Sequence, residues 1–180
     1  MTRVITIVHP VLPAAGRLIC GPRPSRPFRA GLAALVDARV STIACLLDDH
    51  EMPAELVAAY DTSALTILRH AIPDFGRPAD AGGLTAFVND LLDRLRRGET
   101  IYLHCLAGIG RTGTVLACLL KTAGAAGDPV ELVRKIYDPR ALETDAQQRF
   151  ARAFLPGPAT RPGSADAATS DPGDPRAAER

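Results

Sequence analysis

The sequence lacks an excess of charge of either sign. Its 180 residues include 21 Lys and Arg against 20 Asp and Glu, which gives a formal net charge of +1. A protein that binds nucleic acid or an anionic membrane over a broad surface usually carries a marked basic excess. We therefore expect no nucleic-acid partner and no membrane partner, so any charged ligand has to be recognised by local side chains.

Long apolar runs are also missing. No segment approaches the ~20 apolar residues that a helix needs to span a bilayer. The apolar stretch within residues 1–13 is too short for the core of a secretory signal. We therefore expect a cytoplasmic protein.

Paired cysteines are absent, and the four present are Cys20, Cys45, Cys105 and Cys118. No C-x-x-C pair occurs, and the four scattered histidines do not add a spacing typical of zinc sites. We expect no metal and no organic cofactor. A reducing compartment would keep the thiols free, and three of the four cysteines are expected to be small core residues.

One ten-residue string stands out, HCLAGIGRTG at residues 104–113. The β-favouring run before it, residues 100–104, predicts a buried strand, and the Ala- and Leu-rich run after it, residues 112–123, predicts a helix. At such a turn, loop amides and the unpaired N–H groups of the helix converge on one point. The string therefore predicts an anion-binding loop.

Two side chains of this loop suggest chemistry beyond binding. The Cys105 thiol would be surrounded by amide dipoles and a guanidinium, which favour the thiolate, the attacking form of cysteine. Arg111, six positions later, can hold two oxygens of a tetrahedral dianion and stay charged throughout. The neighbouring Thr112 hydroxyl can donate a hydrogen bond to the sulfur as it leaves.

The string resembles the signature loop of the cysteine-dependent protein tyrosine phosphatases, Cys-x5-Arg followed by Thr or Ser, and the chain is most similar to their small dual-specificity type. The resemblance implies catalytic roles for Cys105, Arg111 and Thr112, with His104 and Gly113 supporting the loop. The residues that would bind the phosphate are Leu106, Ala107, Gly108, Ile109, Gly110 and Arg111.

A second stretch, AIPDFGRPAD, places Asp74 on a loop between prolines. On its own, an aspartate in such a place is usually a turn former. Small dual-specificity phosphatases carry their general acid in a similar Pro-Asp loop, and Asp74 precedes Cys105 by 31 positions (105 − 74). The resemblance therefore implies that Asp74 is the general acid.

The order of the remaining elements predicts an α/β fold. We expect strands in residues 4–8, 17–20, 40–47, 65–70 and 100–104, and helices in residues 29–38, 53–60, 82–97, 112–123, 129–137 and after 144. The family resemblance implies a central, mostly parallel sheet of about four or five strands flanked by helices. We assign residues 1–155 to a catalytic domain and 156–180, rich in Pro, Gly and Ala, to a disordered tail.

Three further segments allow more than one interpretation. The basic, proline-rich residues 21–27 suit a rigid connector into a helix, or a docking ligand for an SH3-like partner. The acidic residues 48–51 suit a helix cap better than a metal site. In residues 138–150, Thr144 suits a helix cap. The family resemblance would instead place the Glu143-Thr144 pair and a downstream glutamine, Gln147 or Gln148, near the active site.

The predicted function is hydrolysis of phosphomonoesters in proteins, phosphotyrosine together with phosphoserine or phosphothreonine, through a cysteinyl-phosphate. The uncharged Leu106, Ala107, Ile109 and Gly110 disfavour inositol-lipid phosphates, because relatives that take those tend to place lysines there. A small non-protein phosphomonoester remains an alternative substrate. We expect a monomer, an expectation that no motif in the sequence tests.

Other enzymes and modules use parts of the same pattern. A redox or arsenate-reducing enzyme also uses Cys-x5-Arg and would need a second cysteine, for which Cys45 is the candidate. A non-catalytic phosphate-binding module would usually lack the Cys, the Arg or the Asp. Residues 108–113 also match the dinucleotide-binding G-x-G-x-x-G, but no further strand follows the helix as that motif requires.

Overall fold

A computed structural model describes residues 4–157 of the chain. Its strands are β1 (Ile5–Ile7), β2 (Arg17–Gly21), β3 (Thr42–Cys45), β4 (Thr66–Arg69) and β5 (Thr100–His104). Its helices are α1 (Phe28–Asp37), the short 3-10 helix η1 (Asp49–Glu51), α2 (Ala54–Asp61), α3 (Ala81–Arg96), α4 (Gly110–Thr122), α5 (Pro129–Ile136) and α6 (Asp145–Ala153). Each predicted strand and helix is present, with ends that differ by a few residues.

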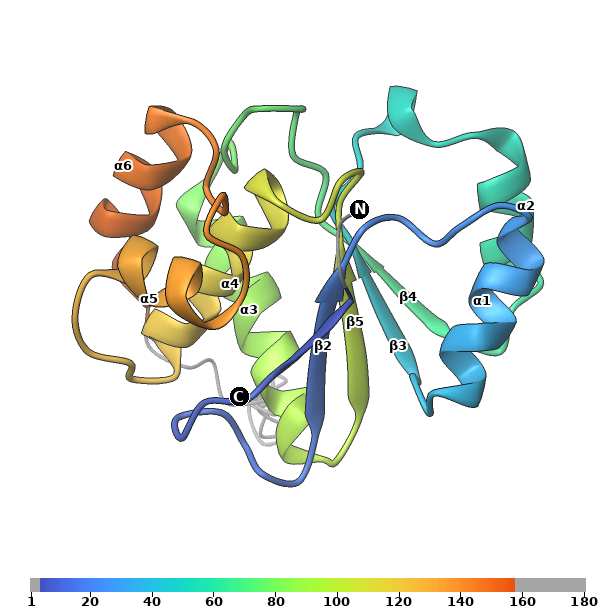
Figure 1. The fold of residues 1–180 in the computed structure, drawn as a ribbon, viewed down its shortest axis with the longest axis horizontal. Helices are drawn as coiled ribbons and strands as arrows, with labels where there is room; N and C mark the ends of the chain where they lie inside the picture. Colours follow the sequence, from blue (N-terminus) through green and yellow to red (C-terminus); the bar gives the residue numbers. More distant parts are fainter. Residues whose placement is uncertain (1–3, 158–180) are drawn as a thin grey trace, which may run out of the picture.

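The five strands form one sheet in the order β1-β2-β5-β3-β4. The β2, β5, β3 and β4 strands are parallel, and only β1 pairs in the antiparallel sense, with β2. Helices α1 and α2 lie on one side of the sheet and α3 to α6 on the other (Figure 1). The predicted α/β fold with a mostly parallel sheet is therefore confirmed.

The alternation of side chains along each strand produces two separate cores. Ile43, Cys45 and Tyr102 are buried in a cluster with residues of α1 and α2. Their strand neighbours Ala44 and Leu103 belong to the larger cluster formed with α3, α4 and α5. A strand buried on both faces needs apolar residues at successive positions, which explains the continuous apolar runs in the sequence.

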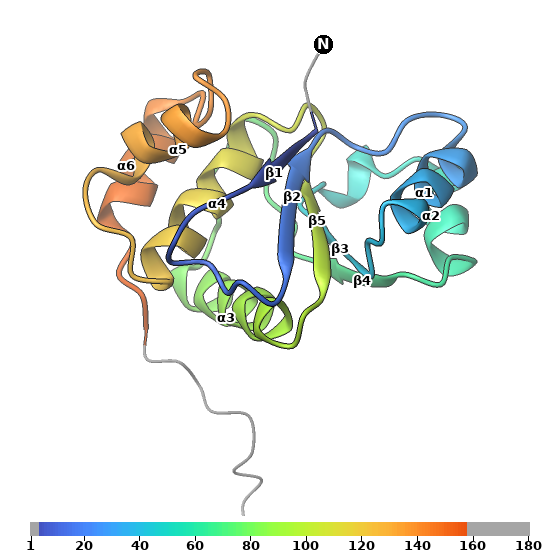
Figure 2. The ribbon, with the colours of Figure 1, turned by 60° about the horizontal axis from the view of Figure 1, so that its bottom comes forward.

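The chain places the end of β5 in the middle of the sheet. It leaves β2 through α1, builds β3, α2 and β4, then crosses through α3 to insert β5 between β2 and β3 (Figure 2). Parallel α/β sheets bind ligands at the carboxyl ends of their strands, where the order of connection reverses. The topology therefore puts the loop after β5, residues 105–109, at that position.

The proline-rich residues 21–27 connect β2 to α1. Pro24 is buried, and the Pro22 carbonyl accepts a hydrogen bond from the Tyr102 hydroxyl at 2.7 Å. The connector interpretation of this segment is therefore confirmed by its packing.

The predicted tail falls almost wholly outside the described residues. The proposed boundary at residue 155 and the predicted disorder of the tail consequently stay predictions. Within residues 4–157, none of the helices combines the length and the apolar composition needed to cross a membrane.

Candidate active site

The backbone of the loop after β5 folds around the side chain of Cys105. The Gly108 amide donates a hydrogen bond to Cys105 Sγ at 3.2 Å. Gly108 has φ of +74°, and a Cβ there would overlap the Gly21 carbonyl. This backbone shape and this close approach both require glycine. The sulfur consequently lies against the backbone of the loop just before the first turn of α4.

Arg111, in the first turn of α4, contacts residues from two other loops of the site. Only 2% of it is exposed, and its guanidinium donates to both carboxylate oxygens of Glu51, with Nη2 at 2.9 Å from Oε1. It also donates to Asp74 Oδ1 at 2.8 Å and to the Ile72 carbonyl at 3.0 Å. The guanidinium therefore holds the loops after β3, β4 and β5 together.

Glu51 is a site residue that the sequence did not reveal. Asp48 and Glu51 form a capping box around η1, as the helix-cap interpretation predicted. The same carboxylate pairs with Arg111, and this hydrogen bond lowers the pKa of Glu51 below its ordinary value. The partners are 60 residues apart, and no local pattern signals such a pair.

Asp74 lies on the loop between β4 and α3, as predicted. Its side chain is 44% exposed, and Oδ1 accepts both from Arg111 and from the Phe75 amide at 3.1 Å. The structure therefore brings together the three side chains that the sequence singled out, Cys105, Arg111 and Asp74.

His104, the last residue of β5, contacts the backbone of the loop that follows it. Its Nδ1 lies 3.0 Å from the Cys105 carbonyl oxygen and its Nε2 lies 2.8 Å from the Tyr60 hydroxyl. Because a carbonyl only accepts, Nδ1 carries the hydrogen and Nε2 accepts from Tyr60. Burial lowers the pKa of His104 to about 4, so the ring is neutral near pH 7. This supports a structural role instead of proton transfer.

The Thr112 hydroxyl has an unusual environment. It is buried, and no acceptor or donor within residues 4–157 contacts Oγ1. Buried hydroxyls usually have a partner. Among the described residues, this hydroxyl next to Arg111 is therefore a buried donor that has no acceptor.

Helix α6 contacts the loop that carries Asp74. Thr144 caps α6, as predicted, and its hydroxyl also donates to the Phe75 carbonyl at 3.2 Å. The Gln147 amide donates to the Gly76 carbonyl at 2.9 Å, whereas Gln148 donates to Leu142. Of the two glutamines, Gln147 therefore reaches the site, through the Asp74 loop.

These parts enclose a cavity of about 140 Å³. Its lining residues are Asp74, Phe75, Cys105, Leu106, Ala107, Arg111, Glu143 and Gln147. Pockets for drug-sized ligands measure about 300–1,000 Å³, so this one fits a small group such as a phosphoryl group. Glu143 belongs to the Glu-Thr pair that the family resemblance places near the active site, and its carboxylate lies against Gly110.

The other three cysteines are buried, as expected of core residues. Burial raises the pKa of the Cys45 thiol, and its sulfur contacts Met52 Sδ at 4.0 Å. Cys20 and Cys118 lie in the same core cluster as the catalytic loop's Cys105. Within the described residues, no group of three or more His, Cys, Asp or Glu side chains is arranged to hold a metal ion.

Fold and site together define a cysteine-dependent phosphatase type of domain, with a Cys-x5-Arg loop between a central parallel strand and a helix. The chain belongs to this group: residues 11–165 match the family model described as "Swiss Army Knife protein, DSP-PTPase phosphatase domain". The resemblance seen in the sequence is therefore confirmed.

Known proteins agree with this assignment. The chain is 38% identical over 88 residues to mouse (Mus musculus) tyrosine-protein phosphatase non-receptor type 4, covering 44% of this chain and 9% of that protein. It is 30% identical over 135 residues to the Arabidopsis thaliana phosphatidylglycerophosphate phosphatase PTPMT2, covering 71% of this chain and 56% of that protein. The chain thus spans a small part of the first relative and little more than half of the second.

The fold is also that of solved structures. A crystal structure of kinase associated phosphatase (KAP), with serine in place of its catalytic-site cysteine, superposes with a TM-score of 0.70 at 19% identity. The match covers 85% of this chain and 93% of that one. At 19% identity, this similarity is evidence for a shared fold alone.

The neutral state of buried His104 makes stability depend on pH. The unfolded chain binds a proton near pH 6.5 that the folded chain takes up only near pH 4, so stability falls as pH drops through this window. The loss amounts to roughly 3 kcal/mol at about 1.4 kcal/mol per pKa unit. His104→Gln should flatten this slope in urea unfolding at stepped pH, and His50→Gln, at an exposed site, should keep it. Equal slopes for wild type and His104→Gln would contradict the burial argument.

The pair between Glu51 and Arg111 should stabilise the native state. Glu51→Gln leaves the buried guanidinium with less compensation, and we expect the free energy of unfolding to fall by about 1–3 kcal/mol. Asp49→Asn removes the same charge from an exposed ion pair with Arg69 and should cost less than about 0.5 kcal/mol. Urea unfolding at pH 7 measures the free energy of unfolding of both variants. Similar losses would show that the Glu51 pair stabilises the protein no more than an exposed ion pair does.

Proposed function

We propose that this protein is a phosphomonoester hydrolase that acts on phosphotyrosine, together with phosphoserine or phosphothreonine, in proteins. The observation that carries the proposal is the convergence of Cys105, Arg111 and Asp74 on one cavity of about 140 Å³. A nucleophile, a fixed cation and a proton donor are what phosphoryl transfer through a covalent intermediate needs. Membership of the dual-specificity phosphatase family supports the same chemistry.

In the first step, the phosphoryl group enters against the loop amides and Arg111. Because Asp74 occupies one guanidinium nitrogen, the phosphate oxygens displace it, while Glu51 keeps the guanidinium oriented. The Cys105 sulfur attacks phosphorus, the bond to the ester oxygen breaks, and protonated Asp74 gives its proton to that oxygen. The product alcohol or phenol leaves and a cysteinyl-phosphate remains.

In the second step, Asp74, now a carboxylate, takes a proton from a water molecule that attacks phosphorus. The sulfur–phosphorus bond breaks and inorganic phosphate forms. The unpaired Thr112 hydroxyl donates to the departing sulfur. His104, held between Tyr60 and the loop backbone, keeps the loop in shape without exchanging a proton.

Substrate choice follows from the cavity wall. Leu106 and Ala107, which line the cavity, and their loop neighbours Ile109 and Gly110 carry no charge, and a cavity of about 140 Å³ suits the phosphorylated side chain of a protein. A small or lipid phosphomonoester is the second candidate, supported by the similarity to a protein named phosphatidylglycerophosphate phosphatase. A reducing, cytoplasmic location and a monomeric state complete the proposal, and four free cysteines support the former.

The first test is hydrolysis of a small aryl phosphate with chelator present. We expect turnover by the wild type and a loss of at least about a thousandfold in Cys105→Ser, because the hydroxyl is a poor nucleophile without a base beside it. Cys118→Ser, which changes a buried core cysteine, is the matched control and should keep most of the activity. Turnover that survives in Cys105→Ser would sink the mechanism.

The role of Asp74 is tested with leaving groups of different pKa. Asp74→Ala should slow a phenyl phosphate, a poor leaving group, by about a hundredfold or more, and an activated nitrophenyl ester far less. Measuring kcat for both esters from pH 5 to 8 gives the comparison. Equal slowing would mean that another carboxylate donates the proton, and Glu143 on the cavity wall is then the candidate.

A further inference from the structure

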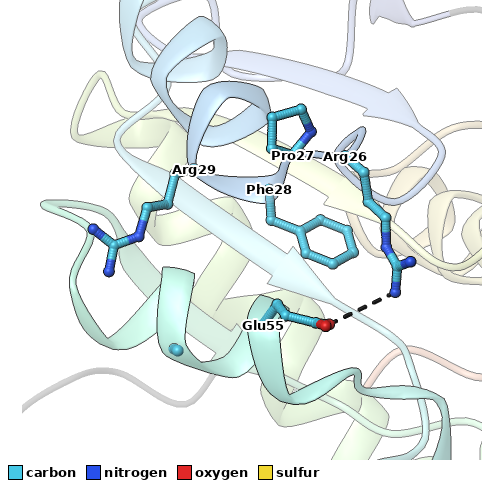
Figure 3. A pocket seen from close by; sticks show the side chains of 6 residues that line it. Arg26, Pro27, Phe28, Arg29 and Glu55 are labelled. Carbon is cyan, nitrogen blue, oxygen red and sulfur yellow. Dashed lines mark ion pairs between the residues drawn. The ribbon is translucent and has the colours of Figure 1, made fainter.

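A larger hollow of about 640 Å³ lies apart from the catalytic cavity, between the beginnings of α1 and α2. Figure 3 shows the Phe28 ring between the side chains of Arg26 and Arg29, with Glu55 reaching in from α2. Phe28 is buried, whereas the two arginines and Glu55 are exposed. The hollow therefore combines an aromatic centre with two accessible cations.

The hollow is electropositive. Arg23 and Arg26 place their guanidinium groups 5.4 and 5.3 Å from the Phe28 ring centroid. The first turn of α1 has no acidic residue and no side-chain cap, so the helix dipole adds positive charge. Among the lining residues only Glu55 opposes this charge, and it pairs with Arg26 at 3.6 Å while 74% exposed. Such an exposed pair is weak and is readily exchanged for another carboxylate.

The hollow is joined to the catalytic loop by the connector 21–27. The Arg23 amide donates to the Leu106 carbonyl of the loop at 3.1 Å, and the Arg23 side chain reaches Phe28. Helices α1 and α2 follow parallel strands, so they begin at the edge of the sheet where the catalytic loop lies (Figure 1). Arg23 thus contacts both the loop after β5 and the Phe28 ring that lines the hollow.

A second hollow also borders Arg29. It measures about 240 Å³ and lies between α1 and α2, with Leu32, Val36 and Ala59 beside the polar Thr62 and Ser63. The two hollows share Arg29, so we treat them as one groove in which accessible arginines alternate with apolar and small polar side chains. A polypeptide that carries carboxylates as well as apolar side chains matches this mixed lining. A planar bilayer does not enter a concave groove.

We propose that this groove docks an acidic segment of the phosphoprotein substrate, whose Asp or Glu side chains pair with Arg26 and Arg29 while the phosphorylated residue occupies the Cys105 cavity. The proposal rests on the proposed phosphatase function and names its substrate class. The substrate carboxylate at Arg26 replaces Glu55. The groove adds selectivity for sequence to a catalytic cavity too small to supply it.

The test compares two phosphotyrosine peptides of equal length, one flanked by Glu and Asp and the other by Gln and Asn. We expect the wild type to show a higher kcat/KM for the acidic peptide, with a preference that shrinks as salt is added. R26Q/R29Q should reduce the preference about three- to tenfold. E55Q should increase it about two- to threefold by removing the competing carboxylate, a gain that damage to the fold cannot produce.

The matched control is R96Q/R97Q, which removes the same charge at the end of α3, at the opposite edge of the sheet. It should leave the preference unchanged. A small aryl phosphate, which cannot reach the groove, should be hydrolysed equally by all variants. Equal kcat/KM for the two peptides in the wild type, or equal effects of both double variants, would overturn the groove while leaving the phosphatase chemistry standing.

Binding without turnover separates the two proposals. Fluorescence anisotropy of the unphosphorylated acidic peptide should show binding that R26Q/R29Q weakens and R96Q/R97Q does not. If the protein showed such binding but no phosphatase activity, the result would support docking of the acidic segment in the groove and would contradict the proposed function. Arginine-dependent binding to phosphatidylglycerol vesicles, with none to the peptide, would overturn the docking of an acidic segment.

Discussion

The buried guanidinium of Arg111 is the interaction on which the site depends. A cation that is 2% exposed has lost most of its hydration, so it needs compensating partners. Glu51, Asp74 and the Ile72 carbonyl supply them from two different loops. The loops after β3 and β4 are thereby fixed relative to the loop after β5, and the active site is formed by the same contacts that satisfy one charge.

The two carboxylates around Arg111 are not equivalent. Glu51 is nearly buried and holds both nitrogens, whereas Asp74 is 44% exposed and holds one. The exposed partner costs less to displace, because water can solvate its carboxylate. The geometry therefore holds Glu51 more firmly than Asp74, in keeping with the proposed role of Asp74 as the general acid.

The sheet provides the rigidity that such a site requires. β5 is bordered by β2 and β3 and covered on both faces, so the chain leaves it at a fixed point. Tyr137, which directly follows α5, donates to the Gly108 carbonyl, and α6 contacts the Asp74 loop through Gln147. The loop after β5 is thus held by strands on one side and by helices and their ends on the other.

The sequence alone determined the strand and helix pattern and predicted the anion loop and the nucleophile, because these depend on spacing between near neighbours. The family resemblance added Asp74, which lies on a loop whose position no local pattern predicts. Only the tertiary structure decided that Glu51 pairs with Arg111 while it still caps its helix, and that Arg26 and Arg29 border a groove. Those contacts join segments far apart in the chain, and their partners are chosen by the packing of whole elements and by the need to compensate buried charge.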